Sequence, residues 1–165
     1  MSRSLFTLAL ALAVLQAAPA RGVCSPRLLA IERSKNANIV VYDARLHGSS
    51  FDTDEPVSAY WLMNAEHGQR QELNLIEKMK AYGFSIESSP SGPLMTMKAL
   101  KDRPVRLVMA KGCPRAVMTI SGRDAYVGRV FIKTREGSDS DVEFIELSGR
   151  AVANGRTLHE RFTPR

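Results

Sequence analysis

The sequence is short of the residues and motifs that mark many enzymes and metal proteins. Among its 165 residues there are only two cysteines, three histidines and one tryptophan. The cysteines form no CxxC pair and the histidines are scattered, which argues against zinc and thiol-redox sites. The chain has no GxSxG or HExxH motif, and Ser34-Lys35 lacks the SxxK spacing of acylating hydrolases. We expect neither a metal nor a cofactor.

Two acidic stretches have the carboxylate spacing of calcium loops without the rest of the pattern. They are FDTDEP at 51–56 and SDSDVE at 138–143. Neither has the glycine and the terminal glutamate of an EF-hand loop. Asp, Ser and Pro are frequent turn residues, so both stretches are interpreted as solvated turns.

Long apolar runs are also absent, apart from Leu5 to Leu15 at the start of the chain. This run follows a short basic start and precedes Ala18-Pro19-Ala20, which predicts a secretory signal peptide over residues 1–20, cleaved near Ala20. It is too short to span a bilayer, which needs about 20 apolar residues. Arg21-Gly22-Val23 does not form a lipidation signal before Cys24. We expect a periplasmic or secreted protein with no transmembrane segment in the mature chain.

The remaining residues, 21–165, are enough for a single well-buried domain. Loss of Arg3 with the leader lowers the count of lysine and arginine from 23 to 22, and the 17 acidic residues then leave a net charge of +5. Cys24 and Cys113 both lie in this part of the chain. An oxidising compartment favours a disulfide between them over two free thiols.

Short alternating runs separated by turn residues fill most of this domain. VSAYWLM at 57–63, for example, directs Val57, Trp61 and Met63 to one face of a strand. Asn154-Gly155 is the strongest hairpin signal in the chain. About nine or ten such runs predict a mainly β (α+β) fold, an antiparallel meander closed into a small lipocalin-like β-barrel. Strands do not alternate with helices, which excludes a doubly wound parallel sheet.

One segment has a different period. Leu73, Ile76, Met79 and Tyr82 recur at every third position, polar residues lie between them, and Gly83 follows. We expect one amphipathic helix over 71–82 that covers one end of the barrel with its apolar stripe.

The stretch from Ser34 to Asn38, SKNAN, interrupts the alternation between two predicted strands. Asn36 and Asn38 both tolerate the left-handed conformation, so the stretch predicts a hairpin loop. The alternative is that it forms part of a site. That alternative requires Lys35 and Asn36 to face the same cavity as three aromatic residues, Tyr42, Tyr60 and Trp61.

A barrel of this kind suggests a ligand site in its interior. Between Lys98 and Arg135 there are ten cationic residues against Asp102 and Asp124, so part of the sheet should attract an anion. The candidate ligand-binding residues are large apolar side chains expected to line the interior and arginines expected at its rim: Trp61, Met63, Met109, Phe131, Arg106 and Arg129. The alternatives are a completely filled core and a solvated cationic outer face.

The weak catalytic candidates are Glu32, Lys35, Tyr42 and Tyr60. A lysine or glutamate held close to tyrosines can transfer protons if burial moves its pKa. The alternative is a cross-strand ion pair and two amphipathic tyrosines with no chemical role.

The strings IERSKNANIVVYDARL, DEPVSAYWLMN and ELNLIEKMKAYGF resemble an uncharacterised family of exported bacterial proteins, a domain of unknown function. The resemblance spans about 28–84 and implies a bacterial envelope protein. It implies no activity and no functional residue.

Taken together, these features favour a non-enzymatic binding module for a small apolar or amphipathic anionic ligand, such as a lipid-like molecule. The alternatives are an enzyme with the acid–base site named above and a structural protein that binds another envelope protein. Nucleic acid is not an expected partner, because no aromatic and glycine motif accompanies the cationic residues.

Overall fold

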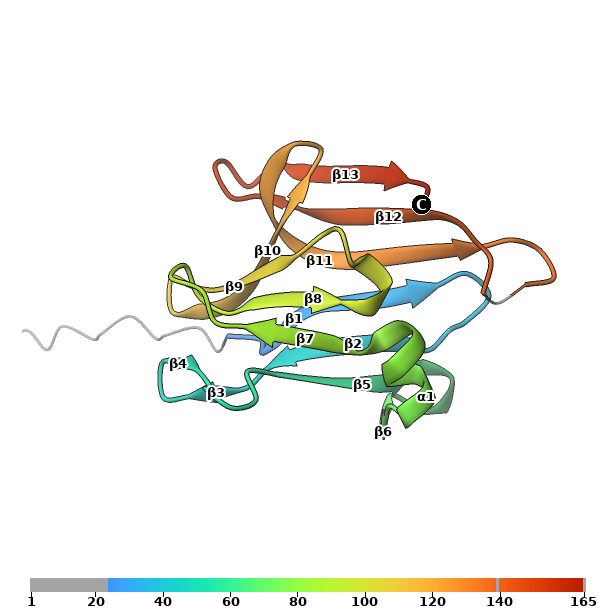
Figure 1. Cartoon of the computed structure of the whole chain (residues 1–165), viewed down its shortest axis with the longest axis horizontal. Coiled ribbons are helices and arrows are strands. Elements are labelled where there is room, and N and C mark those ends of the chain that lie inside the picture. The colour runs from blue at the N-terminus through green and yellow to red at the C-terminus, as the bar shows by residue number, and fades with distance from the viewer. Residues whose placement is uncertain (1–23, 139, 165) are drawn as a thin grey trace, which may run out of the picture.

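The computed structural model describes residues 24–138 and 140–164, so the expected leader over residues 1–20 lies outside the described residues. Eleven of the described strands form one strongly curled sheet, and two more form a separate hairpin (Figure 1). The strands are β1 Arg27–Arg33, β2 Ile39–Ala44, β3 Leu46–His47, β4 Ser50–Phe51, β5 Val57–Met63, β6 Gln69–Glu72, β7 Phe84–Glu87, β8 Leu94–Met97, β9 Val105–Ala110, β10 Cys113–Ile120, β11 Arg123–Thr134, β12 Val142–Ala151 and β13 Thr157–Phe162. The predicted mainly β fold is confirmed.

The curled sheet is two antiparallel meanders joined by one parallel pair. Strands β2, β5 and β6 follow β1 on one side, and β7 to β13 form the other part in chain order. The join is a parallel pairing of β1 with β11, in which Ala30 lies opposite Arg129 and Arg33 opposite Ile132. Strands β6 and β7 lie at the two ends of the strand path, so the sheet is a curled half-barrel with an open seam.

The concave side of the half-barrel is filled by its own side chains. Strands that alternate inward and outward supply most of this core. Its largest fully buried members are Tyr42, Leu29, Ile31, Met95, Met97, Leu107, Met118, Ile120, Ile145, Leu147 and Val40. The interior therefore contains packed apolar residues where the sequence suggested a ligand.

A β-bulge in β11 changes which of its side chains point into the core. Ala125 and Val127 point into the core, and the register then shifts between Val127 and Arg129, with Gly128 as the extra residue. Beyond the bulge Val130 and Ile132 point inward. Strict alternation from Val127 would have placed Phe131 inside, and the bulge is the reason that Phe131 lies on the outer face.

The predicted helix is shorter than 71–82 and faces differently. Residues up to Glu72 belong to β6, and the helical segment consists of an α-helical turn, α1 Leu75–Glu77, followed by a π-helical turn, η2 Lys78–Tyr82. Short 3₁₀ turns lie at Asn64–Glu66 and Lys98–Leu100. Leu73 and Tyr82 are buried, but Ile76 and Met79 are each 64% exposed.

The spacing explains this difference. Leu73 precedes the N-cap Asn74, so only Ile76, Met79 and Tyr82 of the predicted stripe lie in the helical segment. At 3.6 residues per turn, each step of three residues falls about 60° short of a full turn, so these three side chains do not share one face. The expected short helix at the end of the half-barrel is present, but its apolar stripe is not continuous, because only Leu73 and Tyr82 contribute to the core. None of the helices in the described residues is long and apolar enough to cross a membrane.

The predicted disulfide is present between Cys24 and Cys113, whose Cα atoms are 5.4 Å apart. It ties the first described residue to the start of β10. The predicted hairpin loop is also confirmed, because β1 ends at Arg33 and β2 begins at Ile39.

Candidate functional site

The loop between β1 and β2 forms one wall of a pocket at the end of the half-barrel. Ser34 joins this loop to β11, since its backbone N–H donates to the carbonyl of Ile132 at 2.9 Å and its Oγ accepts from the backbone N–H of Thr134 at 3.0 Å. Lys35, and neither of the asparagines, adopts the left-handed conformation, with φ of 66°. The sequence prediction placed the turn correctly but assigned the unusual backbone conformation to the wrong residues.

The asparagines of the loop act through their side chains. Oδ1 of Asn36 accepts from the backbone N–H of Asn38 at 2.9 Å, and Oδ1 of Asn38 accepts from the backbone N–H of Ala65 at 3.2 Å. Asn64 in turn donates to the carbonyl of Ala37 at 2.9 Å. These bonds connect the loop to the turn between β5 and β6, so the wall that carries Lys35 is held in place at both ends.

Two aromatic residues form the opposite wall. Trp61 of β5 packs edge-on against Tyr82 of η2, with ring centroids 5.1 Å apart and ring planes at 77°. Nη1 of Arg33 lies 3.4 Å from the Tyr82 hydroxyl. Below them, the Tyr42 hydroxyl donates to the backbone carbonyl of Tyr82 at 2.8 Å. Burial, followed by the neighbouring Tyr82 phenol, raises the pKa of Tyr42 far above its ordinary value.

Glu77 fixes the orientation of Trp61. Its Oε1 accepts from the indole N–H of Trp61 at 3.1 Å, while its Oε2 accepts from the backbone N–H of Asn74 at 2.8 Å. Oδ1 of Asn74 accepts in return from the backbone N–H of Glu77 at 2.9 Å, which completes a capping box at the start of α1. The helical segment is thus anchored at the same residue that positions the aromatic wall.

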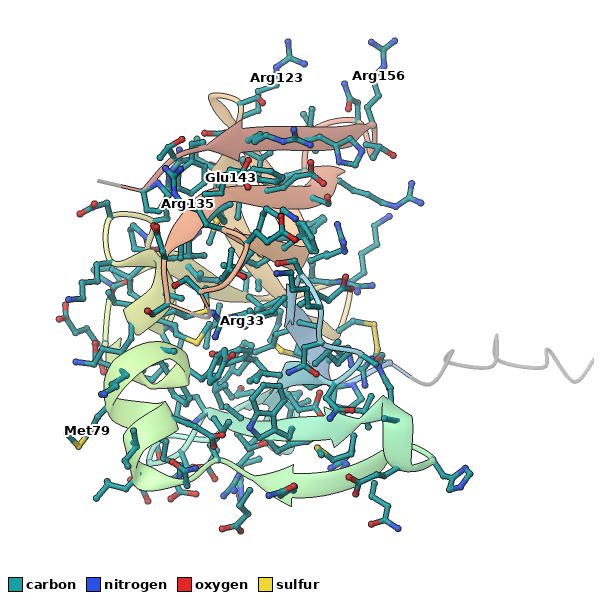
Figure 2. The ribbon with its side chains drawn as sticks, turned by 90° about the vertical axis from the view of Figure 1, so that its right-hand side faces the viewer. Arg33, Met79, Arg123, Arg135, Glu143 and Arg156 are labelled. Carbon is teal, nitrogen blue, oxygen red and sulfur yellow. A yellow bond between two sulfur atoms is a disulfide. The ribbon has the colours of Figure 1, made fainter. Side chains whose placement is uncertain are left out.

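These walls enclose a pocket of about 450 Å³, which we call the end pocket. It carries three cationic side chains, Arg33, Lys35 and Lys80, and one carboxylate, that of Glu77. Figure 2 views this end of the half-barrel, with Arg33 near the middle of the molecule. The complete lining is Arg33, Ser34, Lys35, Asn36, Trp61, Ile76, Glu77, Lys80, Ala81, Tyr82 and Thr134. The pocket combines an aromatic wall with an excess of positive charge.

The three stretches that carry the family resemblance meet at the end pocket. ERSKNAN contributes Arg33 to Asn36, EPVSAYW contributes Trp61, and ELNLIEKMKAYGF contributes the residues of the helical segment. Thr134 is the one lining residue outside these stretches. Segments separated in the sequence therefore build one site.

The four catalytic candidates are not brought together. Lys35 lies at the exposed end of the loop, whereas the Glu32 carboxylate pairs with Arg129 at 2.7 Å on the outer face. Tyr42 is buried in the core, and the Tyr60 hydroxyl donates to Oδ2 of Asp43 at 2.7 Å. Burial, and then the hydrogen bond to the Asp43 carboxylate, raises the pKa of Tyr60. Of the three aromatic residues required beside Lys35 and Asn36, only Trp61 lines their pocket.

Of the six ligand-binding candidates, Trp61 alone lines the end pocket. Phe131 packs on Phe144 on the outer face, with ring centroids 6.3 Å apart, and Arg129 stacks over Phe131 at 4.9 Å. Arg106 pairs with Asp124 at 2.9 Å. The two methionines lie elsewhere: Met63 precedes the turn to β6, and Met109 lines a separate depression beside β4. Both arginines expected at the rim are therefore engaged in ion pairs along the sheet.

Sequence reasoning missed Arg33, Lys80, Tyr82 and Thr134 as site residues. The first three lie inside the strings that carry the family resemblance, and that resemblance is the sequence signal that could have identified them as site residues. Thr134 had no local signal, because it reaches the pocket only through the hydrogen bonds between β11 and the loop after β1.

A larger hollow lies along the open seam between β5, β6 and β7, with a volume of about 970 Å³. Its charged residues are nearly balanced, with Arg45, Arg70, Lys78 and Lys98 against Asp54, Glu55 and Glu72. Arg45 and Glu55 also pair with each other. The charged residues of this seam groove give an excess of only one positive charge, against two in the end pocket, so the end pocket is the better candidate for binding an anion. Within residues 24–138 and 140–164, no group of three His, Cys, Asp or Glu side chains could hold a metal ion.

Comparison with known proteins gives one family. A family model described as a domain of unknown function (DUF4833) matches residues 29–161 of the chain, from β1 to β13. This range contains every residue that lines the end pocket. No curated protein and no solved structure matches the chain.

Proposed function

Since the chain belongs to the DUF4833 family, a domain of unknown function, its function has to be inferred from the end pocket, and we propose that the protein binds a small amphipathic anion without transforming it. Membership of this family agrees with the resemblance to an uncharacterised family that the sequence indicated. The observation that carries the proposal is the position of Arg33, Lys35 and Lys80 around the aromatic wall formed by Trp61 and Tyr82.

The acidic group of the ligand would be bound by the cationic side chains. A guanidinium can donate two parallel hydrogen bonds to a carboxylate or phosphate, so Arg33 is suited to the head of the ligand. Lys35 and Lys80 add positive charge on the two sides of the opening. The hydroxyls of Ser34 and Thr134 already bond to each other at 3.2 Å, and they complete the polar floor.

The apolar part of the ligand would lie against Trp61, Tyr82 and Ile76. Small-molecule sites commonly have volumes of about 300–1,000 Å³ and combine apolar walls with a few placed polar groups. At about 450 Å³ the end pocket lies within this range. The Glu77 carboxylate accepts from Trp61 and Asn74, which offsets its repulsion of an incoming anion.

The disulfide supports a further part of the proposal, that the protein acts outside the reducing cytosol. Stable disulfides such as Cys24–Cys113 belong mainly to oxidising compartments. We propose export, to the periplasm or the medium, with the leader over residues 1–20 as the signal.

The enzyme alternative has no comparable support. It depends on convergence of Glu32, Lys35, Tyr42 and Tyr60, and these side chains lie on the outer face, at a loop tip and in the core. The hydroxyls that line the end pocket, those of Ser34 and Thr134, hydrogen-bond to each other and not to a basic side chain.

Trp61 makes the proposal directly testable, because it is the one tryptophan in the chain and lines the site. Titration with dodecyl phosphate, below its micelle concentration, should change the tryptophan fluorescence and show saturation. Dodecanol, which has the same chain without the charge, should bind at least about tenfold more weakly if charge pairing contributes the order of 1.4 kcal/mol.

Variants assign the binding to the end pocket. Arg33→Gln/Lys80→Gln should weaken dodecyl phosphate binding at least about tenfold, whereas Lys101→Gln, an exposed lysine outside the pocket, should not change it. Native mass spectrometry supplies an independent count of bound ligand. Absence of uptake of dodecyl phosphate, fatty acids and phospholipids would refute the proposal, as would equal weakening by Lys101→Gln.

A further inference from the structure

Three large apolar side chains stand exposed on the helical segment beside the end pocket. Leu75 is 71% exposed, and Ile76 and Met79 are each 64% exposed. We call these three residues the apolar tip. The other exposed large apolar residues in the described part of the chain, Leu46 and Val152, reach only 41% and 43% and lie apart from them. Exposed apolar side chains gathered in this way mark an interaction surface.

The fold holds the apolar tip outward. Leu73 before it and Tyr82 after it are both only 4% exposed, so the segment is anchored in the core at each end. The capping box between Asn74 and Glu77 fixes the first turn. Met79 lies in the π-helical turn and points away from the body of the molecule, as Figure 2 shows at the left edge of the helical segment.

Positive charge surrounds the apolar tip. Lys78 and Lys80 alternate with its residues along the segment, and Arg33 and Lys35 stand on the adjoining wall of the end pocket. Glu77 is the one carboxylate between Leu75 and Tyr82, and both of its oxygens accept hydrogen bonds from Trp61 and Asn74. The exposed carboxylate of Glu72 precedes the segment, at the end of β6.

We propose that the apolar tip, together with Lys78 and Lys80, docks the protein on an anionic lipid bilayer. Apolar side chains flanked by lysines match such a surface, since the apolar groups enter the acyl boundary and the lysines meet the phosphates. A protein groove would require a complementary shape, whereas a bilayer requires only this combination of exposed apolar residues and excess positive charge. The segment lies at the end of the half-barrel opposite the first described residues (Figure 1), so the disulfide-bonded start of the described chain lies away from it.

The docking surface and the end pocket share two residues. Ile76 and Lys80 belong to the lining of the end pocket and also to the exposed helical segment. Docking would therefore place the mouth of the pocket at the lipid surface, where amphipathic anions are concentrated. Docking itself goes beyond the proposed function and does not depend on it; only this last step rests on the proposed function.

The test measures co-flotation of the protein with lipid vesicles. The protein is used from Arg21 onward with its disulfide formed, because the apolar run Leu5–Leu15 would bind lipid by itself, and the described strands and the disulfide all lie within 24–164. Vesicles of equal parts phosphatidylglycerol and phosphatidylcholine should bind it, pure phosphatidylcholine should bind it at least about tenfold less, and added salt should release it.

The decisive variant is Leu75→Ser/Met79→Ser, because neither residue lines the end pocket. It should lower partition onto anionic vesicles at least about tenfold. Its matched control is Leu46→Ser/Val152→Ser, which removes the other two exposed large apolar side chains of the described residues and should leave partition unchanged. Lys78→Gln should weaken docking to a smaller degree. Circular dichroism and thermal unfolding establish that each variant is folded.

Three outcomes would overturn the proposal: no binding to anionic vesicles, equal loss in the control variant, or a wild-type dimer that Leu75→Ser/Met79→Ser dissociates. The last result would assign the surface to a second copy of the chain. Uptake of dodecyl phosphate by Leu75→Ser/Met79→Ser should remain normal, so failure of docking and failure of the end pocket give different results.

Discussion

Asp43 and Tyr60 show how a single polar group is accommodated in this sheet. The Asp43 side chain is only 9% exposed, accepts the Tyr60 hydrogen bond, and lies 3.5 Å from a guanidinium nitrogen of Arg70. Arg70 also stacks over the Tyr60 ring at 4.3 Å. A buried carboxylate is costly unless it is paired and hydrogen-bonded, so these three side chains act as one unit. The arrangement accounts for Asp43 and Tyr60 as structural residues.

Two glycines near the bulge of β11 differ sharply in the space around them. A Cβ added at Gly149 would lie 2.6 Å from the backbone oxygen of Tyr126 and 2.9 Å from Cδ1 of Ile120, whereas one added at Gly128 would meet nothing within 4 Å. Gly149 therefore permits the close approach of β11 and β12 where the register shifts.

Gly149→Ala should lower the free energy of unfolding by about 1–3 kcal/mol, the usual cost of overpacking. Gly128→Ala is the matched control and should change it by less than about 0.5 kcal/mol. Urea denaturation followed by circular dichroism measures both. Equal effects at the two positions would show that contact with Tyr126 is not the reason for the glycine.

At the scale of elements, β13 is held to the rest of the sheet by carboxylates. Glu160 pairs with Arg103 and accepts from the backbone N–H of Ser121 at 2.6 Å, and Glu146 of β12 pairs with Arg161 at 3.0 Å. The hydrogen bond from Arg103, with a smaller contribution from Ser121, lowers the pKa of Glu160 below its ordinary 4.5. The hydrogen bond from Arg161 lowers the pKa of Glu146 in the same way.

These shifts predict the direction of the pH dependence. A carboxylate with a lowered folded-state pKa stabilises the fold fully above its unfolded pKa, and this contribution is lost as pH falls through the folded pKa. The free energy of unfolding should therefore decrease as pH is lowered from about 6 to about 3. Glu160→Gln should be less stable at neutral pH and should show a flatter decrease, measured by urea denaturation at each pH.

Glu143→Gln is the control for this experiment. Glu143 is an exposed glutamate of β12, labelled in Figure 2, that forms no ion pair within the described part of the chain. It should retain the slope of the wild-type protein. A Glu160→Gln variant with the same slope as wild type would contradict the assignment of acid sensitivity to β13.

At the scale of the whole molecule, the disulfide closes a long covalent loop. It joins residues separated by 89 positions and holds the first described residue against the start of β10. Cross-linking so long a loop restricts the unfolded chain, and removal of such a bridge typically costs about 2–5 kcal/mol.

Cys24→Ser/Cys113→Ser should therefore lower the free energy of unfolding by about 2–4 kcal/mol and lower the Tm. Differential scanning calorimetry of the variant beside the oxidised and reduced wild-type protein measures the change. The reduced protein should resemble the variant. An unchanged Tm in both would show that the bridge does not constrain the unfolded chain.

Some features of the site were accessible from local sequence, and others were not. The turn after Arg33 was predicted because polar residues interrupt an alternating run, and Trp61 was predicted to face inward from the alternation of β5. The apolar stripe was not continuous because Leu73 precedes the helical segment and because residues three apart do not stay on one face of a helix. Phe131 was misplaced because a bulge at Gly128 shifts the alternation, and a lone glycine in a strand only hints at a bulge.

The sequence by itself determined the strand-rich composition, the hairpin between β1 and β2, and the pairing of its two cysteines, because each depends on local pattern or on residue count. Tertiary structure alone decided the parallel pairing of β1 with β11, which brings Ser34 against Thr134 across 100 positions of sequence. It also decided that Arg33, Lys80 and Trp61 share one pocket and that Leu75 and Met79 face outward. These outcomes depend on how the sheet curls and where its core is already filled, and no local period carries that information.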